Sequence, residues 1–270
     1  MSWHLHVQQL SGWFQGCLTT LALLTALAAS LEFLTTCTSS SAQYLVTQGG
    51  SSVTQGTLKP PQEVRLKTSD GWIIVGDRYL PSNSARGAIV LLHQRGGTAA
   101  DWQPLATALQ QAGFTVLAID QRGAGRSTQG PGPTGDNAPW QTTGDIAAAI
   151  ASLPMPLPIG LAGASYGANN ALIYAASHHN QVKALALFSP GANYHGLDAL
   201  AAAHSYRGAL VIYHDRDDTI PGSGPQQINA LVPSQNHKLL VFNGTAHGTG
   251  LLEPKVIHSA VNFFLINLKS

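Results

Sequence analysis

A serine flanked by glycines is the feature of this sequence that most directly suggests chemistry. Gly163-Ala164-Ser165-Tyr166-Gly167 follows an apolar run at 158–162 and precedes a helical run at 168–177. Gly-x-Ser-x-Gly between a strand and a helix is typical of a nucleophile held on a sharp turn. The glycines allow this turn without Cβ clashes, and the positive end of the helix then lies near the hydroxyl. The pattern predicts Ser165 as a nucleophile.

A nucleophilic serine needs a general base and an acid that orients the base, and both occur downstream. An apolar run at 209–213 leads into His214-Asp215-Arg216-Asp217-Asp218, and a run at 238–242 leads into a Gly-flanked loop that contains His247. Functional sites of open α/β sheets assemble at the carboxyl ends of strands. The order serine, acid, histidine therefore predicts His247 as the base and one of these three aspartates as the acid.

Strands and helices that could position these side chains are predicted from residue 60 onward. The predicted strands are 63–68, 72–79, 88–93, 115–120, 158–162, 182–189, 209–213 and 238–242, and the predicted helices are 101–112, 143–153, 168–177, 197–204 and 254–268. Most of these strands are short continuous apolar runs, as in sheets that are buried on both faces. The alternation predicts a mostly parallel sheet of about eight strands with helices on both faces.

Further motifs resemble the α/β-hydrolase superfamily, and the resemblance covers about Glu63 to Leu268. His93-Gln94-Arg95-Gly96-Gly97 is similar to the family's His-Gly-x-Gly-Gly loop, and the segment DQRGAGRS at 120–127 is similar to its Asp-x-Arg-Gly-x-Gly-x-Ser segment. The chain looks most similar to cap-less bacterial esterases and to dienelactone-hydrolase-like members, although dienelactone hydrolases use Cys where this chain has Ser165. The resemblance implies an α/β-hydrolase fold and a serine hydrolase.

The same resemblance implies which aspartate is the acid. The family's acid usually lies four residues before a proline that follows the strand. Counting back from Pro221 gives Asp217, with Asp215 and Asp218 as the alternatives. We therefore expect a triad of Ser165, Asp217 and His247.

Two backbone amides are expected to form the oxyanion hole that stabilises the tetrahedral intermediate. One is the amide of Tyr166, the residue after the nucleophile. The resemblance assigns the other to Arg95, beside Gln94, which replaces a glycine of the family motif. The expected reaction is a two-step acyl transfer through an acyl-enzyme intermediate. No cofactor and no metal ion are expected, and residues 38 onward contain no Cys.

The spacing of the strands bears on the substrate. Only residues 190–208 separate two predicted strands at the place where many α/β hydrolases carry a helical cap. We therefore expect no large cap domain and an open site for a small-molecule or polymeric ester. The expected function is a serine hydrolase of carboxylic esters. The alternatives are a peptidase, amidase or thioesterase on the same triad, or a non-catalytic hydrolase-like binding protein.

The charge composition argues against a nucleic-acid partner. The chain has 14 basic and 13 acidic residues, a net charge of +1, and no basic stripe. Nucleic-acid binding needs such a stripe to contact phosphates.

The first 58 residues carry one charged side chain, Glu32, and differ from the rest. We predict a signal, lipoprotein-like or membrane-anchor segment at 1–37, a flexible polar linker at 38–59 and a catalytic domain at 60–270. The apolar run ending at Cys37 resembles a bacterial lipoprotein signal, although no basic residue precedes it. The alternatives are a cleaved secretory signal using Ala26-Leu27-Ala28, an uncleaved anchor or a misassigned start codon. Export, with membrane anchoring or a periplasmic or extracellular location, is the expectation, and a cytoplasmic location is the alternative.

Overall fold

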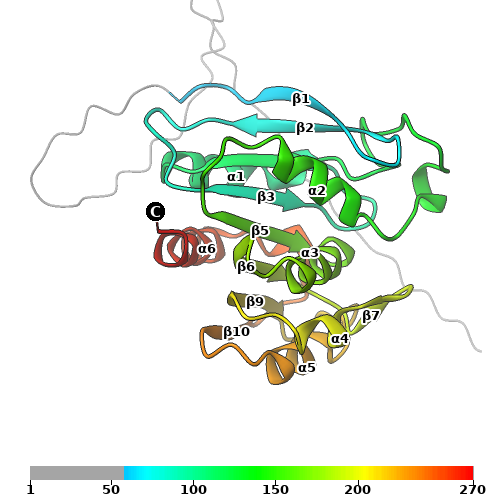
Figure 1. Ribbon diagram of the computed structural model, residues 1–270. Coiled ribbons are helices and arrows are strands. Elements are labelled where there is room, and N and C mark those ends of the chain that lie inside the picture. The colour runs from blue at the N-terminus through cyan, green and yellow to red at the C-terminus, as the bar shows by residue number, and fades with distance from the viewer. Residues whose placement is uncertain (1–57, 270) are drawn as a thin grey trace, which may run out of the picture. The chain divides into compact units, whose positions relative to one another are not determined.

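The computed structural model describes residues 58–269, which form an eight-stranded sheet with helices on both faces (Figure 1). The spatial order of the strands is β1-β2-β4-β3-β5-β6-β9-β10. β2 pairs antiparallel with β1 and β4, and the remaining neighbours are parallel. The strands are β1 (Gln62–Lys67), β2 (Ile73–Tyr79), β3 (Ala88–Leu92), β4 (Thr115–Ile119), β5 (Ile159–Ala164), β6 (Val182–Phe188), β9 (Ala209–Asp215) and β10 (His237–Phe242). The predicted mostly parallel sheet is confirmed.

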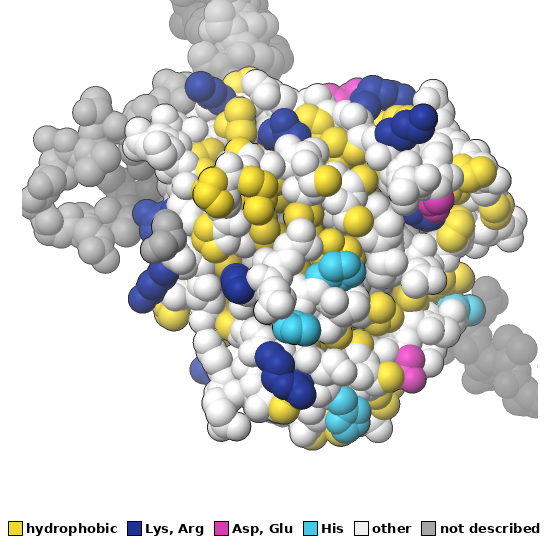
Figure 2. Space-filling view, viewed as in Figure 1, with side chains coloured by type: hydrophobic (Ala, Val, Ile, Leu, Met, Phe, Trp, Pro, Cys, Tyr) yellow, Lys and Arg dark blue, Asp and Glu magenta, His cyan; other side chains and the backbone are white. Residues whose placement is uncertain are grey.

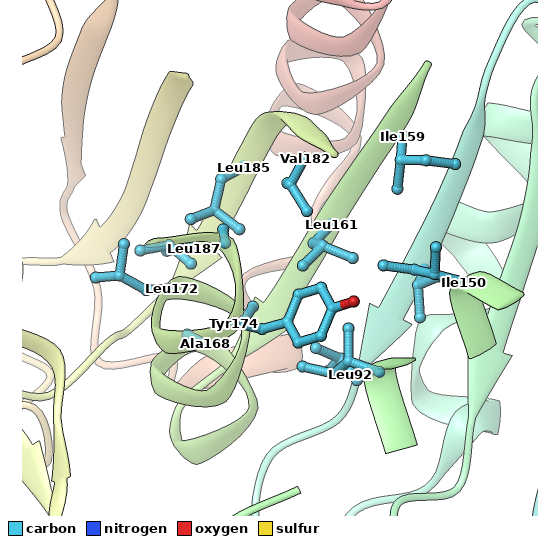
Figure 3. Packing of buried hydrophobic residues seen from close by; sticks show 14 of the residues in the cluster. Leu92, Ile150, Ile159, Leu161, Ala168, Leu172, Tyr174, Val182, Leu185 and Leu187 are labelled. Carbon is cyan, nitrogen blue, oxygen red and sulfur yellow. The ribbon is translucent and has the colours of Figure 1, made fainter. Parts of the chain in front are cut away.

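Two hydrophobic cores lie on opposite faces of this sheet. Helices α1 (Gln103–Gln111) and α6 (Pro254–Asn267) cover one face, and α2 (Thr143–Ala151), α3 (Tyr166–Ser177), α4 (Ala199–Ala203) and α5 (Gly224–Leu231) cover the other. Successive side chains of a strand alternate between the two cores, so Leu161 and Ala162 of β5 belong to different ones. Figure 3 shows Leu187 of β6 beside Leu172 of α3, and Leu161 of the neighbouring strand in the same cluster. Burial on both faces explains the continuous apolar strands.

The connection between β6 and β9 carries no large cap in the part of the chain that the structure describes. It contains a hairpin of β7 (Asn193–Tyr194) and β8 (Leu197–Asp198), followed by α4. The helix expected at 197–204 is shorter because the hairpin includes its first two residues. Asp198 then caps α4 by accepting a hydrogen bond from the Ala201 amide (3.0 Å). The prediction missed this hairpin, which lies close to the site described below.

The segment at 1–57 lies outside the described residues. The predictions of a signal or anchor at 1–37 and of a linker at 38–59 therefore stay predictions. Between residues 58 and 269, no helix is both long enough and apolar enough to cross a membrane.

Candidate active site

Ser165 stands alone between the end of β5 and the start of α3, as the glycine pattern predicts. Its backbone has φ 53° and ψ −120°, in the left-handed half of conformational space that side chains seldom adopt. Its amide donates to the Phe188 carbonyl (2.8 Å), and its carbonyl accepts from the Ala168 amide (2.9 Å). These bonds hold a strained turn, which costs about 1–3 kcal/mol and is characteristic of functional sites. The residue is 7% exposed.

The glycines on either side of Ser165 are required by close backbone contacts. A Cβ on Gly163 would clash with the backbone of Gly167. A Cβ on Gly167 would lie 2.5 Å from the carbonyl oxygens of both Leu92 and His93. The helix start therefore packs directly against the end of β3, and backbone atoms cannot move aside as a flexible side chain could.

We expect Gly167→Ala to destabilise the protein by about 1–3 kcal/mol, because the added methyl group overlaps rigid backbone atoms. Urea unfolding monitored by circular dichroism measures this change. Gly250→Ala is the control, since its Cβ would come no closer than 3.7 Å to a neighbour, the Ala246 Cβ. Equal stability of the two variants would contradict the packing argument.

His247 lies in the loop after β10, and its aspartate partner is Asp218. The imidazole Nδ1 lies 2.8 Å from Asp218 Oδ2. The His247 side chain is 18% exposed, whereas the Asp218 side chain is 1% exposed. Asp217, the residue assigned by counting back from Pro221, is exposed to solvent. The assignment of Asp217 as the partner of His247 is wrong, and one of its two alternatives holds that position.

Backbone pairing explains why the count fails. β9 continues to Asp215, two residues beyond the predicted strand, and Asp217 extends the contact with the next strand by donating its amide to the Gly244 carbonyl (3.0 Å). The Asp218 amide then closes a turn onto the Asp215 carbonyl (3.1 Å). Within this short turn the Asp217 side chain points to solvent and the Asp218 side chain is buried. The spacing of these residues from Pro221 does not show in which direction each side chain of the turn points.

The remaining aspartate, Asp215, holds the loop that carries His247. Its Oδ2 accepts a hydrogen bond from the Ala246 amide (2.9 Å), and a Cβ on Gly244 would clash with this carboxylate. Asp215 therefore positions the chain directly before the histidine.

Ser189 connects Asp218 to the same loop, and the sequence analysis missed it. Its Oγ donates to Asp218 Oδ2 (2.7 Å) and accepts from the Gly248 amide (3.1 Å). The residue is fully buried with φ 50°, directly after β6. A serine in the left-handed region at a strand end leaves no distinctive signal in a single sequence, so its role emerges only from the fold.

The two amides predicted for an oxyanion hole lie on adjacent segments. Tyr166 is the first residue of α3, where an amide has no carbonyl of a preceding helical turn to bond. Arg95 lies in the turn after β3 that the Gly97 amide closes onto the Gln94 carbonyl (3.0 Å). The packing of Gly167 against His93 brings these two segments together.

Gln94 bridges this turn to the histidine loop. Its Oε1 accepts from the amide (3.0 Å) and the hydroxyl (2.8 Å) of Thr249, two residues after His247. Gln94 thus connects the turn after β3 to the loop that carries His247.

His93 lies beneath the site and is not placed to act as a base. Its Nδ1 lies 2.7 Å from the Gln94 carbonyl, and its Nε2 accepts from the Gln121 amide (2.9 Å). Both ring nitrogens are therefore occupied by backbone groups. Burial is the largest influence on the imidazole and lowers the pKa of His93, which favours the neutral ring.

The Arg95 side chain fastens the loop before α2. Its guanidinium donates to the carbonyls of Asp136 (2.6 Å) and Ala138 (3.0 Å) and lies 4.6 Å from the centre of the Trp140 ring. Trp140 also stacks on His195 of the hairpin, with ring centroids 4.0 Å apart. These contacts connect the loop before α2, the turn that carries Arg95 and the hairpin.

A groove of about 600 Å³ lies beside the hairpin. His195, Gly196, Leu197 and Asp198 line it, together with residues of α3 and α4. Neither Ser165 nor His247 lines this groove, so it adjoins the site rather than containing it. Among residues 58–269, no cluster of three His, Cys, Asp or Glu side chains is arranged to hold a metal ion.

Comparison with known proteins gives concordant results. The sequence profile of the family described as alpha/beta hydrolase fold matches residues 87–208. ABHD14B of Homo sapiens, whose name proposes a protein-lysine deacylase activity, is 28% identical over 192 residues, which cover 70% of this chain and 87% of that protein. ABHD14B of Rattus norvegicus is 27% identical and covers 75% of this chain and 98% of that protein.

Solved structures share the fold at lower sequence identity. The Pyrococcus furiosus esterase Pf2001 has a TM-score of 0.64 at 19% identity, covering 78% of this chain and 93% of that chain. Dienelactone hydrolase from Anabaena variabilis has a TM-score of 0.63 at 19% identity, covering 78% of this chain and 100% of that chain. At these identities the similarity establishes the fold.

Proposed function

We propose that this chain, a hydrolase with the α/β-hydrolase fold, cleaves carboxylic esters with Ser165 as nucleophile, His247 as general base and Asp218 as the acid. The observation that carries the proposal is the His247–Asp218 pair beside the serine turn. The two segments are in contact, since a Cβ on Gly248 would lie 3.4 Å from the Ala164 Cβ. Ala164 directly precedes Ser165, and Gly248 directly follows His247.

The geometry around His247 sets the direction of proton transfer. Asp218 accepts a hydrogen bond from the Nδ1–H group, so the Nε2 lone pair is available to remove the Ser165 proton. The serine oxygen then attacks the carbonyl carbon, and the amides of Tyr166 and Arg95 stabilise the oxyanion that forms. His247 transfers the proton to the leaving group, which departs and leaves an acyl-enzyme. Water, deprotonated by His247, hydrolyses the acyl-enzyme and restores Ser165.

Ester and amide substrates both fit this mechanism. The esterase structures with the same fold support the ester, and the curated relatives named as protein-lysine deacylases support an acyl-lysine amide as the second candidate. The open connection without a large cap suits either a small or a polymeric substrate.

A substrate panel tests the proposal. Purified protein is assayed with p-nitrophenyl esters of increasing acyl length, ethyl esters, an acyl thioester, Nε-acyl-lysine peptides and aminoacyl-nitroanilides. We expect ester hydrolysis to have the highest kcat/KM. Faster cleavage of acyl-lysine would replace the ester with the second candidate, and failure of a fluorophosphonate to label Ser165 would reject the serine hydrolase.

We expect Ser189→Ala to lower kcat about tenfold, because one buried hydrogen bond to the Asp218 carboxylate and one to the Gly248 amide are lost together. The control is Ser177→Ala, whose hydroxyl bonds a carbonyl of its own helix, that of Ile173 (3.0 Å). Steady-state kinetics on the best ester measures both variants. Unchanged kcat in Ser189→Ala would show that Asp218 is held without it.

Partners and location form the remaining part of the proposal. On the face in Figure 2, Lys and Arg side chains lie in separate places rather than in one stripe, consistent with a small-molecule substrate and no nucleic-acid partner. Export or membrane attachment through residues 1–37 is proposed from their sequence alone. Mass spectrometry of the mature N-terminus from the native host tests it, and an unprocessed, unlipidated chain recovered in the cytosol would reject it.

A further inference from the structure

The Tyr194 hydroxyl is a buried polar group that the proposed mechanism does not use. It has no hydrogen-bond partner among the residues that the structure describes. A buried hydroxyl without a partner is destabilising, because it has lost its hydrogen bonds to water. Such a cost persists most readily at a functional site, where a substrate atom completes the hydrogen bond.

The hydroxyl lies next to the nucleophile. Burial raises the pKa of Tyr194 to about 12, while the neighbouring Ser165 side chain acts in the opposite direction and lowers it. The contact between the Tyr194 and Ser165 side chains does not meet the geometry of a hydrogen bond. At neutral pH the phenol is therefore protonated and can donate a hydrogen bond beside the attacking oxygen.

The hairpin holds Tyr194 in this place. Asn169, on the helix that begins after Ser165, donates to the carbonyls of Gly191 (3.0 Å) and Leu197 (2.9 Å), on either side of the hairpin turn. The Gly191 amide donates back to Asn169 Oδ1 (3.1 Å). A Cβ on Gly191 would clash with the Tyr194 ring, so the ring packs directly on this backbone. The tyrosine is thus fixed to the helix of the nucleophile.

The strand order indicates which part of the substrate meets this hydroxyl. Arg95 of the expected oxyanion hole follows β3, on one side of β5, whereas Tyr194 follows β6, on the other side. Asp218 follows β9, on the same side as Tyr194, and His247 follows β10, the next strand on that side. The leaving group departs toward His247, because that residue supplies its proton.

We propose that Tyr194 is a further catalytic residue, whose hydroxyl donates a hydrogen bond to the leaving-group heteroatom of the substrate. This role rests on the proposed function. The bond strengthens as negative charge develops on that atom while the tetrahedral intermediate collapses. The proton of the phenol stays on Tyr194, and His247 remains the group that transfers a proton.

The test compares Tyr194→Phe with wild type on acetate esters whose alcohols span a wide range of pKa. An alkoxide leaving group needs more stabilisation than a p-nitrophenoxide. We therefore expect kcat/KM to fall about 10- to 100-fold for ethyl acetate and less than about 3-fold for p-nitrophenyl acetate. The melting temperature should stay equal or rise, because the variant removes an unpartnered buried hydroxyl. The control is Tyr174→Phe, whose hydroxyl bonds Gln181 (2.8 Å) at the other end of α3 and whose kinetics should match wild type for both esters.

A second experiment measures how fast Ser165 is phosphonylated by a fluorophosphonate, a p-nitrophenyl phosphonate and an ethyl phosphonate. It needs no ester turnover, and it separates the proposed serine-hydrolase function from the proposed role of Tyr194. Absence of Ser165 labelling in the wild type would reject the proposed function itself. Wild-type labelling, together with an equal loss for every leaving group or with no loss, would reject the role of Tyr194 alone. A lower melting temperature or a failure of Tyr194→Phe to fold would also reject it, since the hydroxyl would then have a structural role.

Discussion

Replacing Ser165 with alanine is expected to lower kcat for ester hydrolysis by about 10⁶ and to abolish labelling by a fluorophosphonate. The variant removes the only atom that forms the acyl-enzyme bond in the proposed mechanism. A small residual rate is expected, since the amides of Tyr166 and Arg95 still stabilise an oxyanion formed by direct attack of water. Stopped assays at high enzyme concentration, together with intact-protein mass spectrometry after labelling, measure both effects.

The matched control is Ser177→Ala, at the other end of the same helix. Its hydroxyl is bonded to the Ile173 and Tyr174 carbonyls of its own helix, so labelling and kcat should remain at wild-type levels. Circular dichroism checks that both variants are folded. Labelling of the Ser165→Ala protein at another serine would place the nucleophile elsewhere.

The second large effect is expected for Asp218→Asn, which should lower kcat by about 10⁴. Asp218 Oδ2 accepts from the Ser189 hydroxyl and lies 2.8 Å from His247 Nδ1, while Oδ1 accepts from the Ile220 amide (3.2 Å). An asparagine must place its amide nitrogen on one side. On the Oδ1 side, this nitrogen would face the Ile220 amide, which is also a donor. On the Oδ2 side, it would face the Ser189 hydroxyl and His247 Nδ1, and it would then favour the His247 tautomer that carries its proton on Nε2.

Asp217→Asn is the control, one residue away and exposed. It should leave kcat close to wild type. Asp215→Asn should also have a far smaller effect than Asp218→Asn, because its carboxylate bonds a backbone amide rather than the imidazole. Steady-state kinetics of the three variants ranks them, and the largest loss in Asp217→Asn would reverse the assignment made from the structure.

Much of the fold was predictable because its signals are local. β3 and β4 are five-residue apolar runs buried on both faces, and burial on both faces dictates this pattern whatever the partners of a strand. The hairpin at 193–198 was missed because its strands are two residues long and its turn contains His195 at φ 50°. Gly196 takes the second turn position at φ 89°, but His195 stands where Asn, Asp or Gly is usual, and the Asn169 bonds that hold the hairpin come from a helix.

The serine turn and the position of His247 in a loop after the last strand were predictable from local residue types. At Gly163 and Gly167 the backbone of a neighbouring segment lies too close for a Cβ atom, so only glycine fits. Both glycines lie within two residues of Ser165, so a short sequence motif is enough to predict the turn. Which aspartate bonds His247 follows only from the tertiary fold, as do the contacts of Ser189, Gln94 and Tyr194 with the segments next to Ser165 and His247. Those contacts join loops after different strands, so they depend on turn rotation and strand extension. The turn from Asp215 to Asp218 buries the Asp218 carboxylate and leaves that of Asp217 exposed. No local sequence pattern indicates which of the two is buried.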